Sequence, residues 1–184
     1  MNTSDYPHVT DAIKSAGLID TTFMTDFDRD RGTVVHECCR LIIEGDLDRS
    51  SVDPAAAGRV AQFERFMVEV QPVIISAEKP VVSSLNRYQG RLDLLASING
   101  VRAVIDIKGP TRAPWHGLQT AGYARADGIE AALRFSLHLS DERYVLVRHA
   151  DRDDWPTFLA CLSLHNFKLR HRLIEPAVRM EASA

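Results

Sequence analysis

The dipeptide Asn99-Gly100 separates two largely apolar runs, 90–98 and 101–108, and constrains the fold more than any other feature of the chain. Asn-Gly favours a type I′ turn, because both central residues of that turn need a positive φ. A two-residue loop also sets the register of the flanking strands, so that Ile98 faces Val101. One face of this hairpin then carries only apolar pairs and is predicted to be core: Ile98/Val101, Ala96/Ala103, Leu94/Ile105 and Leu92/Ile107.

The opposite face of the same hairpin carries charge. Its predicted pairs are Ser97/Arg102, Leu95/Val104, Asp93/Asp106 and Arg91/Lys108. The two aspartates would have Cβ atoms about 4.5–5.5 Å apart, and such like-charged pairs are destabilising. A divalent cation would offset the repulsion, whereas the alternative is that both aspartates point into water and Lys108 neutralises part of their charge. With a metal, two carboxylates and an ammonium group suit phosphodiester hydrolysis.

The remaining segments alternate between helical and strand-like periodicity. Helices are expected over 9–17, 33–44, 54–68, 115–126 and 154–174, and strands over 72–77, 81–88, 90–98, 101–108, 132–139 and 143–149. This order predicts a mixed α/β (α+β) domain with a central sheet flanked by helices. The length of 184 residues predicts a single domain, 1–184, with an N-terminal helical extension over 1–30 and a C-terminal tail over 175–184.

Composition narrows the functional classes. Lys plus Arg number 22 and Asp plus Glu 25, and a net charge of −3 by itself argues against a generic nucleic-acid binder. The cysteines lack the spacing of a disulfide framework, a zinc site or an iron–sulfur site: Cys38, Cys39 and Cys161. No apolar run approaches the ~18–20 residues of a membrane span, and the N-terminus lacks the apolar stretch of a signal peptide. We therefore expect a cytoplasmic protein without a membrane partner.

Several short motifs, in order along the chain, resemble those of one nuclease superfamily. They are Arg31-Gly32-Thr33-Val34-Val35-His36, then Gly90-Arg-Leu-Asp93-Leu-Leu with Val104-Ile-Asp106-Ile-Lys108-Gly109, and finally Gln119-Thr-Ala-Gly-Tyr123. Together they resemble the catalytic core of the PD-(D/E)XK nuclease superfamily, specifically its RecB-like branch, and are similar to small phage and prophage exonucleases. The resemblance spans about residues 9–150, and it carries Asp106 where the superfamily more often has Glu.

The resemblance implies a metal site. Asp93 and Asp106 would be metal-binding carboxylates, the backbone carbonyl of Ile107 a further ligand, and His36 a ligand through its neutral imidazole. On residue type alone His36 would be a helix-surface or core histidine. Glu78 falls where relatives often carry a glutamate on the first strand, and would hold a water or a second metal. The implied cofactor is one or two Mg²⁺ or Mn²⁺ ions, with no iron–sulfur cluster.

The resemblance also implies roles around the metal. Lys108 would position or activate the nucleophilic water, and Gln119 and Tyr123, which share a helix face, would support Lys108 or contact the DNA backbone. The candidate DNA-binding residues are Arg31, Arg87, Arg91, Arg112 and Trp115. Five further histidines show no metal-ligand spacing and are expected to be surface or structural: His116, His138, His149, His165 and His171.

The expected function is therefore a metal-dependent DNA nuclease, an exonuclease acting on DNA ends or single strands in phage-type recombination, repair or replication. Two alternatives remain open: a structure-specific or nicking endonuclease, and a non-catalytic DNA-binding module that keeps the nuclease fold. The expected partner is single-stranded DNA or duplex ends. A homo-oligomer or a phage recombination partner is compatible with the sequence but not required by it, and a phage-encoded chain would work in the bacterial host cytoplasm.

Overall fold

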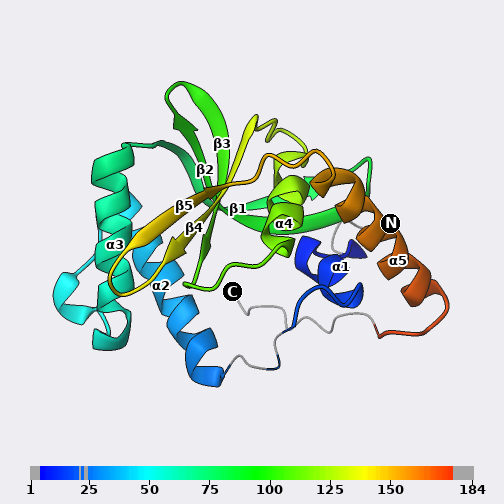
Figure 1. Ribbon diagram of the computed structural model, residues 1–184, viewed down its shortest axis with the longest axis horizontal. Helices are drawn as coiled ribbons and strands as arrows, with labels where there is room; N and C mark the ends of the chain where they lie inside the picture. The colour runs from blue at the N-terminus through cyan, green and yellow to red at the C-terminus, as the bar shows by residue number, and fades with distance from the viewer. Residues whose placement is uncertain (1–4, 21, 23–24, 176–184) are drawn as a thin grey trace.

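A five-stranded sheet with the order β1-β2-β3-β4-β5 forms the centre of the computed structural model, which describes residues 5–20, 22 and 25–175 (Figure 1). Its strands are β1 (Val73–Ser83), β2 (Tyr88–Ile98), β3 (Val101–Lys108), β4 (Leu133–Leu139) and β5 (Tyr144–Arg148). Neighbouring strands are antiparallel except β3 and β4, which are parallel. This exception follows from α4 (Trp115–Ala124), because a helical crossover brings the chain back to begin the next strand at the same end of the sheet. The mixed sheet confirms the predicted α/β (α+β) class.

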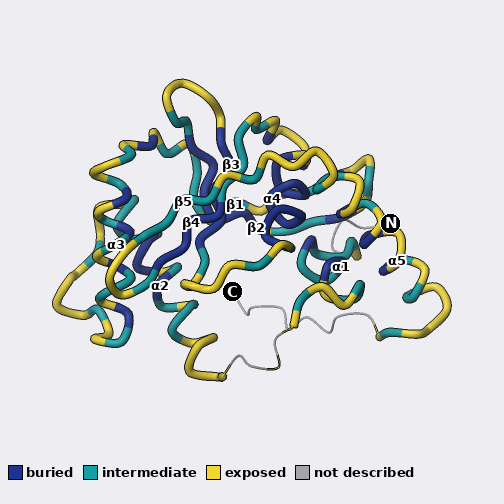
Figure 2. The backbone as a smooth tube through the Cα atoms, in the orientation of Figure 1, coloured by how far each residue is buried: buried dark blue, intermediate teal, exposed yellow. Residues whose placement is uncertain are grey.

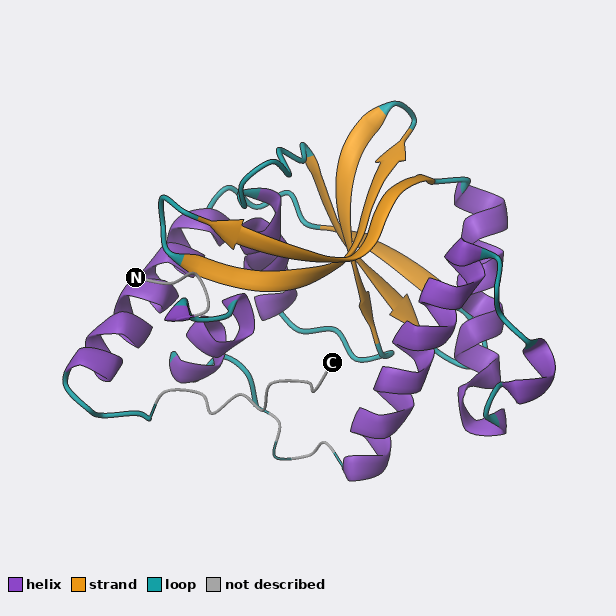
Figure 3. Cartoon of the chain, turned by 180° about the vertical axis from the view of Figure 1, so that it is seen from behind, coloured by secondary structure: helices purple, strands orange, loops and turns teal. Residues whose placement is uncertain are grey.

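The helices form two groups, one on each side of the sheet (Figures 1 and 3). The helices α2 (Asp26–Glu44) and α3 (Pro54–Val70) lie on one side, joined by the short 3₁₀ helix η2 (Arg49–Ser51). On the other side α4 packs with α1 (Val9–Ser15) and α5 (Asp154–Arg170). Within the part of the chain that the structure describes, no helix is long and apolar enough to cross a membrane.

Each side of the sheet has its own apolar core, and much of the central strands is dark blue, the colour of buried residues, in Figure 2. On the α3 side, Ile105 packs with Phe63 and Phe66 of α3. On the α4 side, Val104 packs with Phe158 of α5 and Ile13 of α1. The hairpin face that was predicted to carry the charged residues is also covered by helices. Leu95 and Val104 on this face are as deeply buried as their neighbours.

The register set by the Asn99-Gly100 turn is confirmed. The ladder pairs Ile98 with Val101 and continues in the predicted order as far as Leu94 with Ile105. Asn99 and Gly100 have φ values of 51° and 80°, as a type I′ turn requires. The ladder does not reach the expected pairs Asp93/Asp106, Leu92/Ile107 and Arg91/Lys108, and the amide of Ile107 donates instead to the side chain of Asp93.

The alternation of β2 also breaks at Asp93. Leu94 packs in the α3-side core, whereas Leu92 packs in the α4-side core. The expectation that both leucines belong to one face is therefore wrong. The physical cause lies in the neighbouring strand, where Glu78 has a φ of 47° and interrupts the regular course of β1 between the pairs Ala77/Leu94 and Lys79/Leu92.

Several element boundaries differ from those expected. The helix expected to begin near Thr33 begins at Asp26, because Thr25 and Asp28 form a capping box that starts it earlier. The segments 72–77 and 81–88 are not two strands: residues 73–83 form the single strand β1, and 84–87 form the turn to β2. The last helix ends at Arg170 rather than 174, and α4 ends at Ala124 rather than 126. Most of the expected tail, residues 176–184, lies outside the described residues.

Candidate active site

Three side chains with metal-binding atoms meet where β1, β2 and α2 come together. His36 Nδ1 lies 3.6 Å from Glu78 Oε1 and 3.6 Å from Asp93 Oδ1. The ligand atoms of these three residues all lie within 4.8 Å of one another. The structure thus brings Glu78 of β1 close to His36 and Asp93.

The backbone explains why these three residues converge. Asp93 and Glu78 occupy neighbouring strands at the point where β1 is irregular, and the positive φ of Glu78 is a conformation that non-glycine residues rarely adopt. Such strain persists where surrounding structure enforces it, and it is typical of functional sites. Val35 and Cys39 anchor α2 in the α3-side core, and this places His36 on the flank of α2 that faces the two carboxylates.

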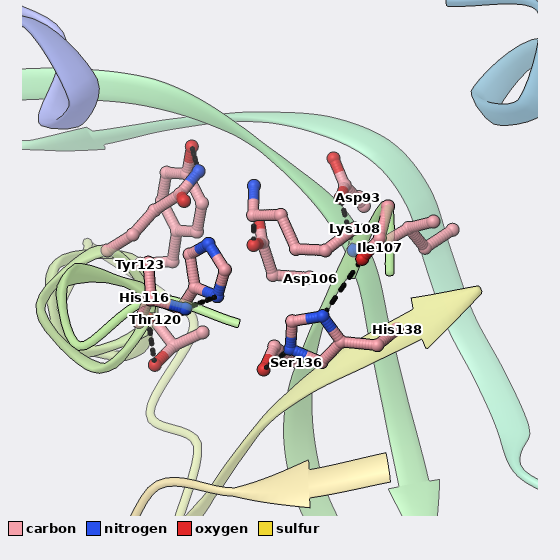
Figure 4. A network of polar contacts seen from close by, with 12 residues as sticks. Asp93, Asp106, Ile107, Lys108, His116, Thr120, Tyr123, Ser136 and His138 are labelled. Atoms are coloured by element: carbon pink, nitrogen blue, oxygen red, sulfur yellow. Dashed lines mark hydrogen bonds and ion pairs between the residues drawn. The ribbon is translucent and has the colours of Figure 1, made fainter. Parts of the chain in front are cut away.

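Asp106 and Lys108 form a second pair beside this group. Lys108 Nζ lies 2.8 Å from Asp106 Oδ2, and Asp106 is only 1% exposed (Figure 4). Asp93 is linked to the same strand by a hydrogen bond of 2.6 Å, which the amide of Ile107 donates to Asp93 Oδ2. Asp106 therefore has an ammonium partner and lies outside the compact group that His36, Glu78 and Asp93 form among the described residues.

The charges in this region shift each other's ionisation. Burial, followed by the negative charge of Asp106, raises the pKa of Asp93 to about 7. Burial lowers the pKa of His36, but the negative charge of Asp93 and the contact with Glu78 outweigh that effect and raise it overall. Burial likewise acts to lower the pKa of Lys108, yet Asp106 and Asp93 together raise it. Without a metal, the site therefore favours bound protons, as expected where buried carboxylates crowd together.

The donor set fits a divalent cation. Mg²⁺ takes ligands at about 2.0–2.1 Å in octahedral geometry, so two ligand atoms on one ion lie about 3–4 Å apart. The separations of 3.6 Å between His36 Nδ1 and the two carboxylate oxygens match this spacing, and they are too long for hydrogen bonds. A cation between these residues would replace the protons that the crowded carboxylates otherwise hold.

Gln119 and Tyr123 lie on α4, facing the sheet. Gln119 Nε2 donates a hydrogen bond of 3.1 Å to Tyr123 Oη, which confirms that the two side chains share a helix face. Both are buried, and Tyr123 packs so closely on β2 that a Cβ at Gly90 would lie 2.7 Å from its ring. Burial, followed by the charge of Asp106, raises the pKa of Tyr123. This placement favours support of the site over contact with the DNA backbone.

The candidate DNA-binding residues have different surroundings. Arg91 Nη1 lies 4.0 Å from Glu78 Oε2, at the edge of the group that His36, Glu78 and Asp93 form. Arg31 forms an ion pair with Asp141, and Arg87 is exposed in the turn between β1 and β2. Trp115 lies under Lys108, whose Nζ is 5.4 Å from the centre of the indole ring.

Sequence reasoning missed Arg59 of α3, whose Nη1 lies 3.7 Å from the position that a Cβ on Gly109 would take. Burial, followed by the positive charge of Arg31, lowers the pKa of Arg59, so the two arginines lie near each other beside the chain that follows Lys108. Arg112 is exposed in that same segment and lines a surface depression of about 800 Å³ with His138. In sequence, Arg59 looks like an ordinary charged residue on an amphipathic helix.

Sequence reasoning also missed a polar layer on β4. In the parallel ladder Asp106 pairs with Ser136 and Lys108 pairs with His138, so these four side chains lie on the same face (Figure 4). His116 of α4 covers them, with its ring centre 5.3 Å from that of His138. His116 and His138 are buried, while His171 is exposed. Only the register of β3 against β4 reveals this layer, and no local sequence signal sets that register.

Comparison with known proteins identifies the fold. No family model and no curated protein matches the chain. An alkaline exonuclease from Laribacter hongkongensis, LHK-Exo, is similar in structure with a TM-score of 0.50 at 12% identity, covering 88% of each chain. The same exonuclease in complex with dAMP gives 0.46 at 9% identity, covering 93% of this chain and 91% of that one. The protein SSO0001 gives 0.45 at 14% identity, covering 91% and 78% respectively. The protein thus shares its fold with the exonuclease LHK-Exo, a mixed five-stranded sheet with flanking helices.

Proposed function

We propose that this protein is a Mg²⁺- or Mn²⁺-dependent deoxyribonuclease that hydrolyses phosphodiester bonds, as an exonuclease acting on DNA ends or single strands. The observation that carries the proposal is the convergence of His36, Glu78 and Asp93 beside the Asp106–Lys108 pair. The LHK-Exo structure shares the fold, and the proposal extends the exonuclease activity in its name to this chain. The sequence motifs resemble those of RecB-like nucleases and favour a role in phage-type recombination, repair or replication.

His36, Glu78 and Asp93 would hold the metal, with Asp106 and the carbonyl of Ile107 as further ligands for one or two ions. When bound, such an ion polarises the phosphate and lowers the pKa of a bound water. The hydrogen bond from the Ile107 amide fixes one oxygen of Asp93 and leaves Oδ1 turned towards His36. The cluster is thus pre-oriented by the backbone of β3, which lowers the cost of assembling it when DNA arrives.

Lys108 would act as a cation in this reaction. Its pKa is raised by Asp106 and Asp93 despite burial, so the ammonium keeps its proton and donates hydrogen bonds. An ammonium fixed at 2.8 Å from Asp106 can orient a water molecule and stabilise the negative charge that develops on the phosphate. Gln119 and Tyr123 would support this arrangement from α4.

DNA would be held by the arginines around the site. The proposed contacts are Arg31, Arg87, Arg91, Arg112 and the ring of Trp115, the set expected from sequence. Because phosphate contacts release counterions, DNA affinity should fall as salt increases. It should also depend on the metal, since the cation reverses the local negative charge of the carboxylates.

The test is digestion of end-labelled DNA by the purified chain. Linear and circular substrates, each single- and double-stranded, are incubated with Mg²⁺, with Mn²⁺ or with EDTA. We expect metal-dependent release of nucleotides from linear DNA, no product in EDTA, and loss of activity in Lys108→Ala. The matched control is Lys14→Ala, which removes the same charge from an exposed position of α1.

Each other outcome has a defined meaning. Cleavage of circular DNA would replace the exonuclease proposal with an endonuclease. DNA binding without turnover in any metal would instead assign a non-catalytic module. Full activity in Lys108→Ala would refute the role given to the lysine.

A further inference from the structure

Ser136, His138 and His149 form a continuous chain of hydrogen bonds next to the candidate site. Ser136 Oγ lies 2.9 Å from His138 Nε2 and 2.9 Å from His149 Nε2. At the other end of the chain, His138 Nδ1 lies 2.9 Å from the carbonyl oxygen of Gly109, the residue that follows Lys108. Ser136 is fully buried and His138 is 3% exposed. Figure 4 shows the serine and the first histidine beside Asp106 and Lys108.

The geometry allows one arrangement of protons in this chain when the imidazoles are neutral. A carbonyl oxygen can only accept, so His138 must donate through Nδ1–H to Gly109. Its Nε2 is then an acceptor, and the Ser136 hydroxyl must donate to it. Because that hydroxyl has one proton, its oxygen accepts from His149, which carries its proton on Nε2. The two histidines are therefore opposite tautomers.

Both histidines are suited to stay neutral. Burial is the largest effect on each and lowers the pKa of His138 and of His149, although the carbonyl of Gly109 and the charge of Asp154 act in the other direction. A buried polar network whose members all have partners is rigid, because breaking any one bond leaves a polar group unsatisfied.

The chain of hydrogen bonds from Ser136, His138 and His149 ends on the backbone carbonyl of Gly109, immediately after Lys108. His138 holds Gly109 from β4, and at the far end of the same loop the amide of Ala113 approaches His116 Nδ1 at 3.4 Å. The side chain of Lys108 is held separately, by Asp106 and by its position over Trp115. The side chain and the following carbonyl are thus restrained independently, which leaves the lysine few orientations.

We propose that His138 is a positioning residue for Lys108, acting through the Gly109 carbonyl and kept in its donor tautomer by Ser136 and His149. The inference rests on the proposed nuclease function and deepens it. A catalytic ammonium displaced by a fraction of its hydrogen-bond length loses much of its effect, so the supporting residue should affect turnover more than binding.

The first test separates positioning from folding by substitution. His138→Leu removes both ring nitrogens, whereas His138→Asn keeps an N–H close to the position of Nδ1. We expect His138→Leu to lower kcat about 10- to 100-fold, the usual cost of losing such a supporting residue, with KM for DNA and Kd for Mn²⁺ unchanged. His138→Asn should recover most of that loss. Equal kcat in wild type and His138→Leu, or no recovery in His138→Asn, would overturn the proposal.

The second test needs no activity and no variant that must fold. Nitrogen-15 correlation spectra of the imidazole rings in the wild-type chain report which nitrogen of each histidine carries hydrogen. We expect His138 protonated on Nδ1 and His149 protonated on Nε2. Any other tautomer of His138 would overturn the positioning chain. If these tautomers are found but the wild-type chain digests no DNA, the proposed nuclease function is refuted, whereas the proposed hydrogen-bond arrangement is not.

Discussion

The turn end and the open end of the β2–β3 hairpin differ in their backbone pairing. Next to the Asn99-Gly100 turn the ladder is regular from Ile98/Val101 to Leu94/Ile105. At the open end the ladder stops, because Asp93 takes the amide of Ile107, and Glu78 distorts the adjoining strand. The turn half buries apolar side chains on both faces, whereas the open half buries Asp93 and Asp106 and leaves Lys108 partly exposed.

This difference predicts that stability depends mainly on the turn half and the proposed activity mainly on the open half. The regular half is stabilised by apolar burial and complete backbone pairing, which need no partner molecule. The open half concentrates like charges and a left-handed residue, both of which cost stability unless something offsets them. A bound cation would offset this cost. Substitutions in the open half should therefore lower activity, whereas substitutions in the turn half should lower the free energy of unfolding.

The largest expected effect is on activity at the open end. Asp93→Asn removes a charged ligand at constant shape, and we expect nuclease turnover to fall about 10²–10³-fold, the scale of losing a preorganised electrostatic contact. Metal-dependent digestion of labelled linear DNA measures this. Ser97→Ala in the turn half is the matched control and should keep wild-type turnover. Comparable losses in the two variants would erase the functional distinction between the halves.

The turn half should instead govern stability. Ile105→Ala opens a cavity beside Phe63 and Phe66, and we expect the free energy of unfolding to fall by about 2–5 kcal/mol. Urea denaturation measures this loss, while titration calorimetry of the folded variant with Mn²⁺ should give the wild-type affinity. A weakened metal site in a folded Ile105→Ala chain would show that the two halves are coupled.

The free energy of unfolding should depend on pH because the carboxyl group of Asp93 is buried beside another carboxylate. The pKa of Asp93 is raised from an ordinary value of 3.8 to about 7, so between these pH values the folded chain holds a proton that the unfolded chain has lost. Rising pH then destabilises the folded state. His36 acts in the same direction because its pKa is also raised. Histidines whose pKa values are lowered by burial act in the opposite direction: His116, His138, His149 and His165.

Comparison with a variant isolates the carboxyl group from those histidines. In EDTA, the Tm of Asp93→Asn relative to wild type should increase from pH 5 to pH 8, because only wild type gains a buried charge. Thermal melts across this range provide the measurement. A difference in Tm that stays constant or shrinks with pH would contradict the raised pKa of Asp93.

The smallest effect is expected at the turn. Gly100 has a φ of 80° with open space around it, so Gly100→Ala introduces backbone strain without a clash and should cost about 1 kcal/mol. Gly32, in the middle of α2 and equally free of neighbours, is the control: Gly32→Ala should stabilise by a similar amount, since alanine favours helix. Urea denaturation of both variants checks the sign. Destabilisation by both would show that the turn is not the source of strain.

Local signals predicted the hairpin, the order of most elements and the candidate residues on β2, β3 and α4. They placed the start of α2 too late, near Thr33, because the capping box formed by Thr25 and Asp28 was not recognised in the sequence. They failed again for the segments 72–77 and 81–88, because Glu78-Lys79-Pro80 interrupts the apolar pattern although the strand β1 continues through these residues. The placement of Asp106 with Lys108, outside the group of His36, Glu78 and Asp93, depends on side-chain directions that strand alternation alone does not give.

By itself, the sequence determined the pairing of β2 with β3 next to Asn99-Gly100, from Ile98/Val101 to Leu94/Ile105, because a two-residue turn fixes how the flanking strands align. Tertiary structure decided which of the candidate ligands converge and what lies beside the lysine. His36 reaches Glu78 and Asp93 only through the packing of α2, and His138 reaches Gly109 only through the parallel pairing of β4 with β3. A crossover through a helix permits many registers, and apolar burial on both faces of the sheet selects one of them.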